Sequence, residues 1–240
     1  SLLRAGTTTA VYYGTIHQRA NQILADVCIN KGQRAIIGKV VMDNTDQCPD
    51  YYRDESTQAA IDGTSEFLNY VKNHGQNIES KVNVAVTPRF IPSCTDEALN
   101  ALGDLASKHS SYVQTHCSES DWEHNYVIER CGKSDTEALM EYGLLTKSTI
   151  LAHGNFISEN DMDLIKDQGA GIAHCPLSNY FFSDAVFPLR RALEKGLRVG
   201  LGTDISGGPS ASVLDSCRSA ITAARALENG TDPNLERDDR

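Results

Sequence analysis

Long apolar runs and clustered positive charge are both missing from this sequence. No stretch is apolar for long enough to cross a bilayer, and residues 1–6 do not form a charged leader followed by an apolar segment. We therefore expect a protein that is neither exported nor bound to membranes. Lys and Arg number 22 against 32 Asp and Glu, which gives a formal net charge of -10. Because nucleic acids and anionic lipids are recognised by clustered positive charge, we expect neither as a partner and favour a small-molecule substrate.

The sequence also lacks any Cys-x-x-Cys pair, although it contains seven cysteines. An odd, scattered set argues against a disulfide framework and against a thiolate zinc site, and a reducing, cytoplasmic location is the expectation. The missing pair also counts against the nucleobase deaminases that hold zinc through Cys-x-x-Cys. Cys117 and Cys175 have no partner pattern for nucleophilic catalysis, so we expect both to pack in the interior.

What the sequence does contain is a regular alternation of short β-branched runs with longer stretches of helical period. This alternation indicates βα units around a parallel sheet, and the length suits one α/β barrel domain over residues 1–240. The expected strands are Thr7–Tyr13, Arg34–Met42, Val82–Thr87, Tyr112–His116, Thr149–His153, Gly171–His174 and Arg198–Thr203. The expected helices are Ile16–Asn30, Ser56–Asn73, Thr95–His109, Glu119–Tyr142, Glu159–Lys166, Val186–Lys195 and Ser212–Leu227.

Seven βα units are one short of a closed (β/α)₈ barrel. Because the first residues resemble the end of a helix that enters a strand, we expect one strand to be missing at the front. The polar tail, residues 232–240, is expected to be poorly ordered. The helix boundaries with the clearest signals are the N-caps Thr95 and Ser158 and the C-terminal glycines Gly32, Gly169 and Gly196.

Three of the expected strands end in a residue that can bind a metal ion. His116 follows Val-Gln-Thr, His153 follows Ile-Leu-Ala, and Asp204 follows Gly-Leu-Gly-Thr. In a parallel barrel the carboxyl ends of all strands face the same mouth, so these side chains are expected to converge. Imidazole nitrogen and carboxylate oxygen suit Zn²⁺ or Fe²⁺, which lower the pKa of a bound water.

Glu119 lies three residues after His116, in the turn that leaves the strand, where a carboxylate can shuttle protons without being a ligand. Each of these residues also has a simpler interpretation when taken alone. A single histidine at a strand end is commonly a hydrogen-bonded core residue, and Gly-Thr-Asp is commonly a turn or a helix cap. Three such residues on strand ends in order favour the metal site.

Four motifs in this order resemble the deaminase branch of the amidohydrolase superfamily, and together they span nearly the whole chain. They are Gln114-Thr115-His116-Cys117-Ser118-Glu119, Leu151-Ala152-His153-Gly154, His174-Cys175-Pro176-Leu177-Ser178-Asn179 and Gly200-Leu201-Gly202-Thr203-Asp204. The resemblance implies a TIM-like (β/α)₈ barrel of the metallo-dependent hydrolase type. Chlorohydrolases and adenosine-type deaminases share the same motifs.

A further segment narrows the resemblance to the guanine deaminase family. Thr87-Pro88-Arg89-Phe90 with Ser93-Cys94-Thr95 is similar to the signature of that family after the fourth strand, as are Tyr12–His17 and Tyr51–Asp54. The guanidinium of Arg89 offers a planar fork of donors for a purine carbonyl, and Phe90 offers a face for stacking. The alternative is that Arg89 pairs with a surface carboxylate and Phe90 packs in the core.

The resemblance implies a role for each matching position. His116 and Asp204 would be metal ligands, and His153 would hold the attacking water or complete the metal shell. Glu119 would be the proton shuttle, with Asp204 helping to protonate the departing ammonia, while Arg89 and Phe90 would bind the base. The implied activity is hydrolysis of guanine to xanthine and ammonia with Zn²⁺, or Fe²⁺, in a cytoplasmic homodimer of purine catabolism.

The chain departs from the family pattern in two places. The family takes two more ligands from a His-x-His on the first strand, and no two of the seven histidines here are separated by one residue. Residues 180–184, Tyr-Phe-Phe-Ser-Asp, stand where a Leu-x-Ser-Gly-like stretch is typical. We therefore expect a fragment that lacks the first strand and the small flanking β-domain. His174 is interpreted as a structural residue or a support for the ligands.

Two other functions remain open at this point. The same fold and metal chemistry could serve another aminated heterocycle, such as a triazine, an adenosine-like nucleoside or a pterin. From a different class, the 240 residues could be an inactive association module, since an open barrel exposes strand edges and apolar faces.

Overall fold

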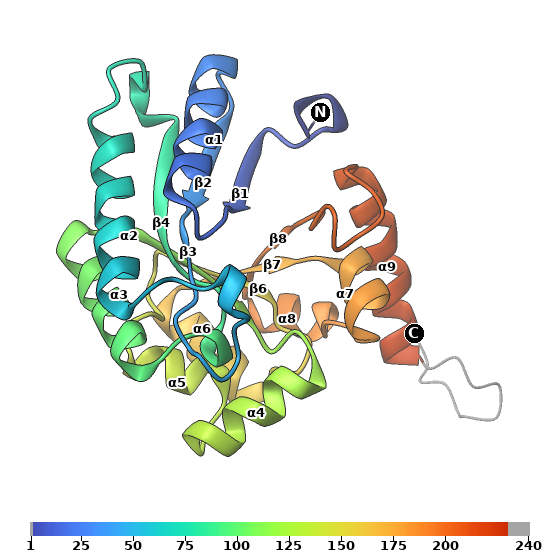
Figure 1. Ribbon diagram of the computed structural model, residues 1–240. Coiled ribbons are helices and arrows are strands. Elements are labelled where there is room, and N and C mark those ends of the chain that lie inside the picture. Colours follow the sequence, from blue (N-terminus) through green and yellow to red (C-terminus); the bar gives the residue numbers. More distant parts are fainter. Residues whose placement is uncertain (1, 230–240) are drawn as a thin grey trace.

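A single curled sheet of parallel strands organises the molecule (Figure 1). The computed structural model describes residues 2–229, so the expected disorder of residues 232–240 lies outside the described part. The spatial order of the main strands is β1 (Thr9–Tyr13), β2 (Arg34–Gly38), β4 (Val82–Pro88), β5 (Tyr112–Cys117), β6 (Thr149–His153), β7 (Gly171–His174) and β8 (Arg198–Leu201). The short strand β3 (Val40–Val41) continues the direction of β2 and pairs with β4.

Helices cover the outside of the curl (Figure 1). They are α1 (Gln18–Lys31), α2 (Thr57–Lys72), α3 (Asp96–His109), α4 (Asp121–Cys131), α5 (Asp135–Glu141), α6 (Glu159–Gln168), α7 (Pro176–Ser183), α8 (Leu189–Lys195) and α9 (Val213–Asn229). Four short 3₁₀ helices are η1 (Leu2–Ala5), η2 (Asp50–Tyr52), η3 (Ile78–Ser80) and η4 (Ile91–Ser93). The seven main strands alternate with these helices, which confirms the α/β class and the seven expected βα units. None of the described helices is both long and apolar enough to cross a bilayer.

The predicted helix caps are confirmed by their backbone contacts. The hydroxyl of Thr95 accepts the N–H of Ala98, and Ser158 forms a capping box with Asp161. The three predicted terminal glycines adopt left-handed φ angles of 65°, 71° and 83°. These positions therefore carried reliable local signals, because the left-handed conformation is unfavourable for residues with a Cβ.

The prediction of one helix over Glu119–Tyr142 was wrong. Gly132 adopts a φ of 69° and ends α4, and Ser134 then starts α5 with a capping box to Glu137. Helix α7 was not predicted at all. Pro176 occupies its first turn, where the missing N–H of proline costs nothing.

Several predicted boundaries were also too wide. The run Thr7–Tyr13 pairs only from Thr9, the run Arg34–Met42 divides into β2 and β3, and the run Arg198–Thr203 stops pairing at Leu201. The stretch expected as a helix over Val186–Lys195 becomes helical only at Leu189.

The main hydrophobic core lies between the outer face of the sheet and the helices. Along β5 the side chains alternate, so that Val113 and Cys117 belong to this core while Gln114 and His116 lie on the other face of the strand. The N–H₂ group of Gln114 donates to the carbonyl of Tyr12 on β1 at 2.7 Å, across the inside of the curl. The inner face is therefore where polar side chains from different strands meet.

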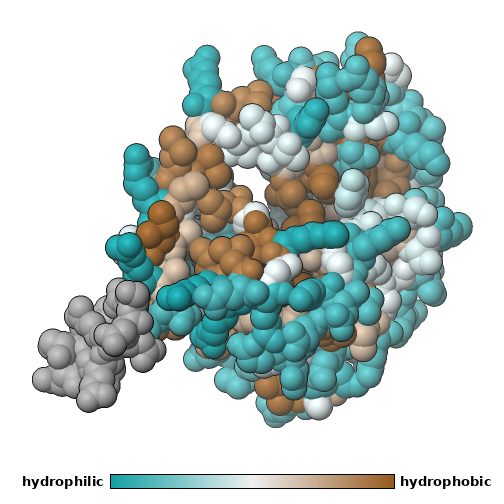
Figure 2. All heavy atoms as spheres, turned by 180° about the vertical axis from the view of Figure 1, so that it is seen from behind, coloured by the Kyte–Doolittle hydropathy of each residue, from teal (hydrophilic) through white to brown (hydrophobic). Residues whose placement is uncertain are grey.

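Within residues 2–229, β1 and β8 are the two edges of the sheet, because they pair with β2 and β7 but not with each other. A cavity of about 250 Å³ lies inside the curl, with residues of β1 on one side and Leu201 to Ile205 on the other. The view from behind shows a hollow bordered by hydrophobic side chains (Figure 2).

Candidate active site

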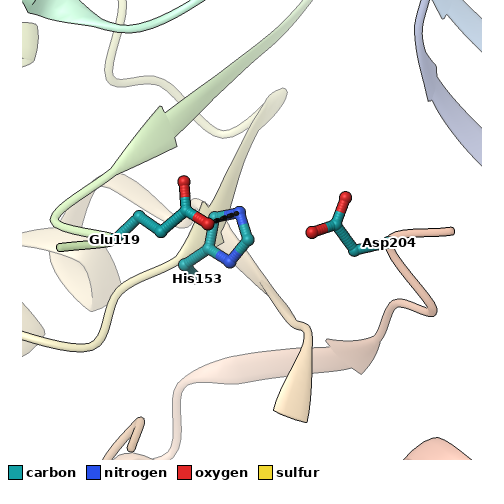
Figure 3. A group of neighbouring side chains, drawn as sticks. All are labelled: Glu119, His153 and Asp204. Atoms are coloured by element: carbon teal, nitrogen blue, oxygen red, sulfur yellow. Dashed lines mark ion pairs between the residues drawn. The ribbon is translucent and has the colours of Figure 1, made fainter. Parts of the chain in front are cut away.

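The ends of β5, β6 and β8 bring the predicted chemical residues together. One ligand atom each from Glu119, His153 and Asp204 lie within 4.8 Å of one another, and the picture shows the His153 ring between the two carboxylates (Figure 3). The ring of His116 stacks on that of His153 with centroids 5.4 Å apart and planes at 15°. The four residues therefore share one end of the barrel, as the strand-end argument required.

The backbone at this end has unusual conformations. His153 has a φ of 72°, Asp204 a φ of 45°, and Ser118, just after β5, a φ of 48°. Positive φ is uncommon for residues with side chains and costs of order 1 kcal/mol or more each. Such strain persists only where surrounding contacts hold it, and here it occurs in or beside the turns that carry the candidate ligands.

The ring of His116 is held in one orientation by the backbone just after β4. Its Nδ1 lies 2.7 Å from the carbonyl oxygen of Arg89, and the ring also contacts Tyr13 with centroids 4.2 Å apart. Because a carbonyl can only accept, Nδ1 must donate, which leaves the lone pair on Nε2. Burial, followed by the nearby His153, lowers the pKa of His116 to about 4, so the imidazole is neutral at pH 7.

His153 is almost fully buried, and its two nitrogens face different partners. Nε2 lies 3.5 Å from the carboxylate of Glu119, and Nδ1 lies 2.8 Å from the side-chain oxygen of Asn179. Burial raises the pKa of Glu119, and the adjacent His153 opposes that change. A carboxyl group with a raised pKa is suited to take up a proton and to hand it on near neutral pH.

The donor atoms at this end fit a zinc or iron ion. The ligand atoms that lie close enough for one ion come from Glu119, His153 and Asp204, whereas the predicted set was His116, His153 and Asp204; His116 adjoins this group through its ring stacked on His153. Together these residues offer imidazole nitrogen and carboxylate oxygen. The carboxylates of Glu119 and Asp204 also supply negative charge at this end of the barrel, which favours a cation.

Arg89 and Phe90 lie beside this cluster, as predicted. A small pocket of about 140 Å³ is lined by Arg89, Phe90, His116, Glu119, Phe182, Asp204 and Gly207. The guanidinium carbon of Arg89 is 5.1 Å from the centre of the Phe90 ring, and no carboxylate among residues 2–229 lies within ion-pair distance of Arg89. Phe90 is only half-buried, next to Trp122. The alternative of a surface ion pair and a core phenylalanine therefore has no support in the described residues.

Sequence reasoning missed a buried acidic pair behind Glu119. Glu123 is 1% exposed and its carboxylate accepts the backbone N–H of Glu119 at 2.8 Å. Asp135 accepts the hydroxyl of Ser118 at 2.9 Å, so the two carboxylates hold the turn that carries Glu119. Burial, and then the charge of Asp135, raises the pKa of Glu123 well above its usual range. The signal was hidden because Glu123 was interpreted as part of one long amphipathic helix.

Asn155 and Asn179 were also missed as site residues, although Asn179 closes a motif quoted above. Both are buried, at 8% and 1% exposure, next to His153 and Glu119. Asparagine in a sequence carries no indication of its partners, so only the fold identifies them.

His174, Cys117 and Cys175 do not take part in the ligand cluster. Neither ring nitrogen of His174 has a hydrogen-bond partner among residues 2–229, and the ring packs with its centroid 5.0 Å from that of Phe187. Burial raises the pKa of both cysteines far above the usual value, so they are neutral thiols and not nucleophiles. All seven cysteines are free.

A curled sheet of parallel strands with histidines and carboxylates at their carboxyl ends is typical of an α/β-barrel protein of the metal-dependent hydrolase type. The sequence model of the Amidohydrolase family matches residues 1–237. The chain belongs to that family.

The chain is also similar to individual members of this family that are named guanine deaminases. The chain is 40% identical over 227 residues to the guanine deaminase of Dictyostelium discoideum and 38% identical over 229 residues to that of Mus musculus. Each alignment covers 94% of this chain and 49% of the relative, so the chain spans about half the length of these curated relatives. The crystal structure of guanine deaminase from C. acetobutylicum with bound guanine superimposes with a TM-score of 0.89 at 30% identity, over 98% of this chain and 55% of that one.

Proposed function

We propose that the protein containing this chain hydrolyses guanine to xanthine and ammonia. The observation that carries the proposal is the convergence of His116, His153, Asp204 and Glu119 beside a pocket that presents Arg89 and Phe90. The similarity to guanine deaminases of animals, an amoeba and bacteria supports guanine over another aminated heterocycle.

His116, His153 and Asp204 would hold the metal ion, and Zn²⁺ fits their donor atoms best, with Fe²⁺ as the alternative. When bound, the ion supplies a Lewis acid that makes the attacking water more acidic. The His-x-His implied by the family resemblance does not occur in these 240 residues, and we propose that it lies outside them in a single barrel domain that includes residues 1–240.

Glu119 would move the proton. Its carboxylate takes a proton from the attacking water and delivers it to a ring nitrogen, while the water oxygen bonds to the carbon that bears the amino group. The hydroxyl group formed on that carbon would then give its remaining proton, with the help of Asp204, to the amino group. As the carbon–nitrogen bond breaks, ammonia leaves and the carbonyl of xanthine forms. The raised pKa of Glu119 lets it hold the first proton between the two transfers.

Arg89 and Phe90 would recognise the base. The guanidinium has no competing carboxylate in the described residues, so its donors are available to a purine carbonyl. The half-exposed ring of Phe90 offers a stacking face.

The test is ammonia release from guanine by the full-length protein and its variants. Glu119→Gln should lower kcat by a factor of about 10²–10⁴, whereas Glu129→Gln, an exposed site on α4, should not change it. Arg89→Ala should raise KM for guanine. Ammonia release from a triazine, an adenosine-like nucleoside or a pterin, but not from guanine, would favour the alternative substrate. Failure with every substrate would favour an inactive association module.

A cytoplasmic homodimer is proposed on the family resemblance. The seven free cysteines fit a reducing compartment. Gel filtration with light scattering measures the number of chains.

A further inference from the structure

A chain of three hydrogen bonds links the ring of His153 to the backbone of Glu119. Nδ1 of His153 lies 2.8 Å from Oδ1 of Asn179, Nδ2 of Asn179 lies 2.6 Å from Oδ1 of Asn155, and Nδ2 of Asn155 lies 2.7 Å from the carbonyl oxygen of Glu119. We call these residues the amide relay. Its members come from α7, from the turn after β6 and from the turn after β5.

The direction of every bond in the relay is determined at one end. The carbonyl of Glu119 can only accept, so the N–H₂ group of Asn155 must face it. The oxygen of Asn155 is then left for Asn179, which must donate with its own N–H₂ group. The oxygen of Asn179 therefore faces His153, and Nδ1 of His153 must be the protonated nitrogen.

In the neutral imidazole, the form that can bind a metal ion, this assignment leaves the lone pair of His153 on Nε2, the nitrogen that faces Glu119. His116 has the same tautomer, because its Nδ1–H donates to the carbonyl oxygen of Arg89. Both imidazoles thus present Nε2 as the free ligand atom, which a metal ion requires of each.

We infer that Asn179 and Asn155 are positioning residues, which hold His153 in the Nδ1–H form and tie its orientation to the backbone of Glu119. The inference deepens the proposed function and rests on it for the role of Glu119. The benefit is that the candidate ligand and the candidate proton shuttle share one rigid support. Partners of this kind on ligand histidines contribute about 10–100-fold to metal affinity or activity.

Because the amide relay is buried, the loss of one of its hydrogen bonds is expected to cost free energy. Asn179 is 1% exposed and Asn155 is 8% exposed, so a lost partner is not replaced freely by water. Asn179 contacts His153 and is not among the residues that line the small pocket, although Phe182, one turn later on α7, is. A change at Asn179 is therefore expected to act on kcat and metal affinity more than on guanine KM.

The test compares Asn179→Leu, Asn179→Asp and Asn155→Ala in the full-length protein. Asn77→Leu is the matched control, since it removes three hydrogen bonds around Val71 and Val82 just before β4, at the other end of the strands. Three quantities are measured at one fixed pH. They are guanine turnover, the dissociation constant for Zn²⁺ by competition with a chelating indicator, and the protonation of each His153 nitrogen in zinc-free protein by ¹⁵N NMR of labelled histidine.

Asn179→Leu should weaken zinc binding by about 10–100-fold and lower kcat, with a mixture of the two His153 tautomers. Asn179→Asp keeps an oxygen acceptor for Nδ1–H and should recover most of the zinc affinity. Asn155→Ala should give a smaller loss of zinc affinity and the same mixture of His153 tautomers. Without its partner Asn155, the side-chain amide of Asn179 can rotate by 180° and present either its oxygen or its N–H₂ group to His153. Asn77→Leu should lower stability without changing any of the three measurements.

Wild-type zinc affinity together with a single Nδ1–H tautomer in both Asn179→Leu and Asn155→Ala would overturn the inference. Should Asn179→Leu fail to fold, Asn155→Ala and Asn179→Asp decide the matter by the same zinc and NMR measurements. A protein that shows the expected zinc and NMR changes but releases no ammonia from guanine would refute the proposed function and support the relay. Guanine turnover that is unaffected in all relay variants would support the proposed function and refute the relay.

Discussion

Glu123 offers the sharpest test of how the turn around Glu119 is held. Its carboxylate accepts the N–H of Glu119 at 2.8 Å, while its other oxygen has no hydrogen-bond partner in the described residues. Glu123→Gln keeps an oxygen for that N–H and places an N–H₂ group beside Asp135, so both ends of the side chain are satisfied. Glu123→Ala removes the acceptor altogether.

The two substitutions should therefore have opposite effects on the free energy of unfolding. Leaving the buried N–H of Glu119 unpaired costs about 1–3 kcal/mol, so the Ala variant should be less stable by that amount or slightly more. The Gln variant should equal or exceed the wild type at pH 7, because the pKa of Glu123 is raised by burial and by Asp135. Because the pKa of Glu123 is raised in the folded state, its contribution to stability is fully present below the usual carboxyl pKa of 4.5. That contribution is lost as the pH rises from 4.5 through the pKa of the folded state.

Urea denaturation at pH 5 and pH 8 measures both effects, and guanine turnover measures the position of Glu119. The Ala variant should lose kcat, and the Gln variant should retain it. Glu129→Gln, exposed on the same helix, should change stability by no more than about 0.5 kcal/mol. If the Gln variant proved as unstable and as slow as the Ala variant, the ionised carboxylate itself would be required and the reasoning would be refuted.

Three further predictions concern packing, pH and metal. Gly103→Ala should destabilise by about 1–3 kcal/mol in urea titrations, because a Cβ would lie 1.9 Å from the carbonyl oxygen of Tyr142; Gly75→Ala, with open space around it, should not. Burial, and then His153, lowers the pKa of His174 to about 4, so wild-type stability should fall as pH drops from 6.5 toward 4. In zinc-free protein, His174→Leu should remove roughly 3 kcal/mol of the loss of stability between pH 6.5 and pH 4. An unchanged dependence of stability on pH would contradict the lowered pKa of His174. Chelation at a zinc concentration of about 100 times Kd should remove about 2.7 kcal/mol of stability, seen as a lower Tm, and zinc but not Mg²⁺ should restore it.

Some elements were predictable because their signals are local. The predicted ranges of β6 and β7 agree with the structure at both ends, and the caps at Thr95 and Ser158 form as expected. A β-branched run between turns, or a serine three residues before an acidic residue, acts through neighbours in the chain. The split of the helix at Gly132 was missed because a single glycine inside a helical pattern can be tolerated without ending the helix.

Some residues of the candidate site could likewise be predicted from the sequence, and others could not. By itself the sequence determined that His116, His153 and Asp204 lie at the carboxyl ends of three strands, and parallel strands of a barrel must bring such ends to one mouth. Only the tertiary structure decided which groups support them. Asn179 reaches His153 across 26 residues, and Asn155 reaches the carbonyl of Glu119 across 36. Strand order fixes where the main chain goes, but side-chain partners depend on packing distances that no local pattern in the sequence encodes.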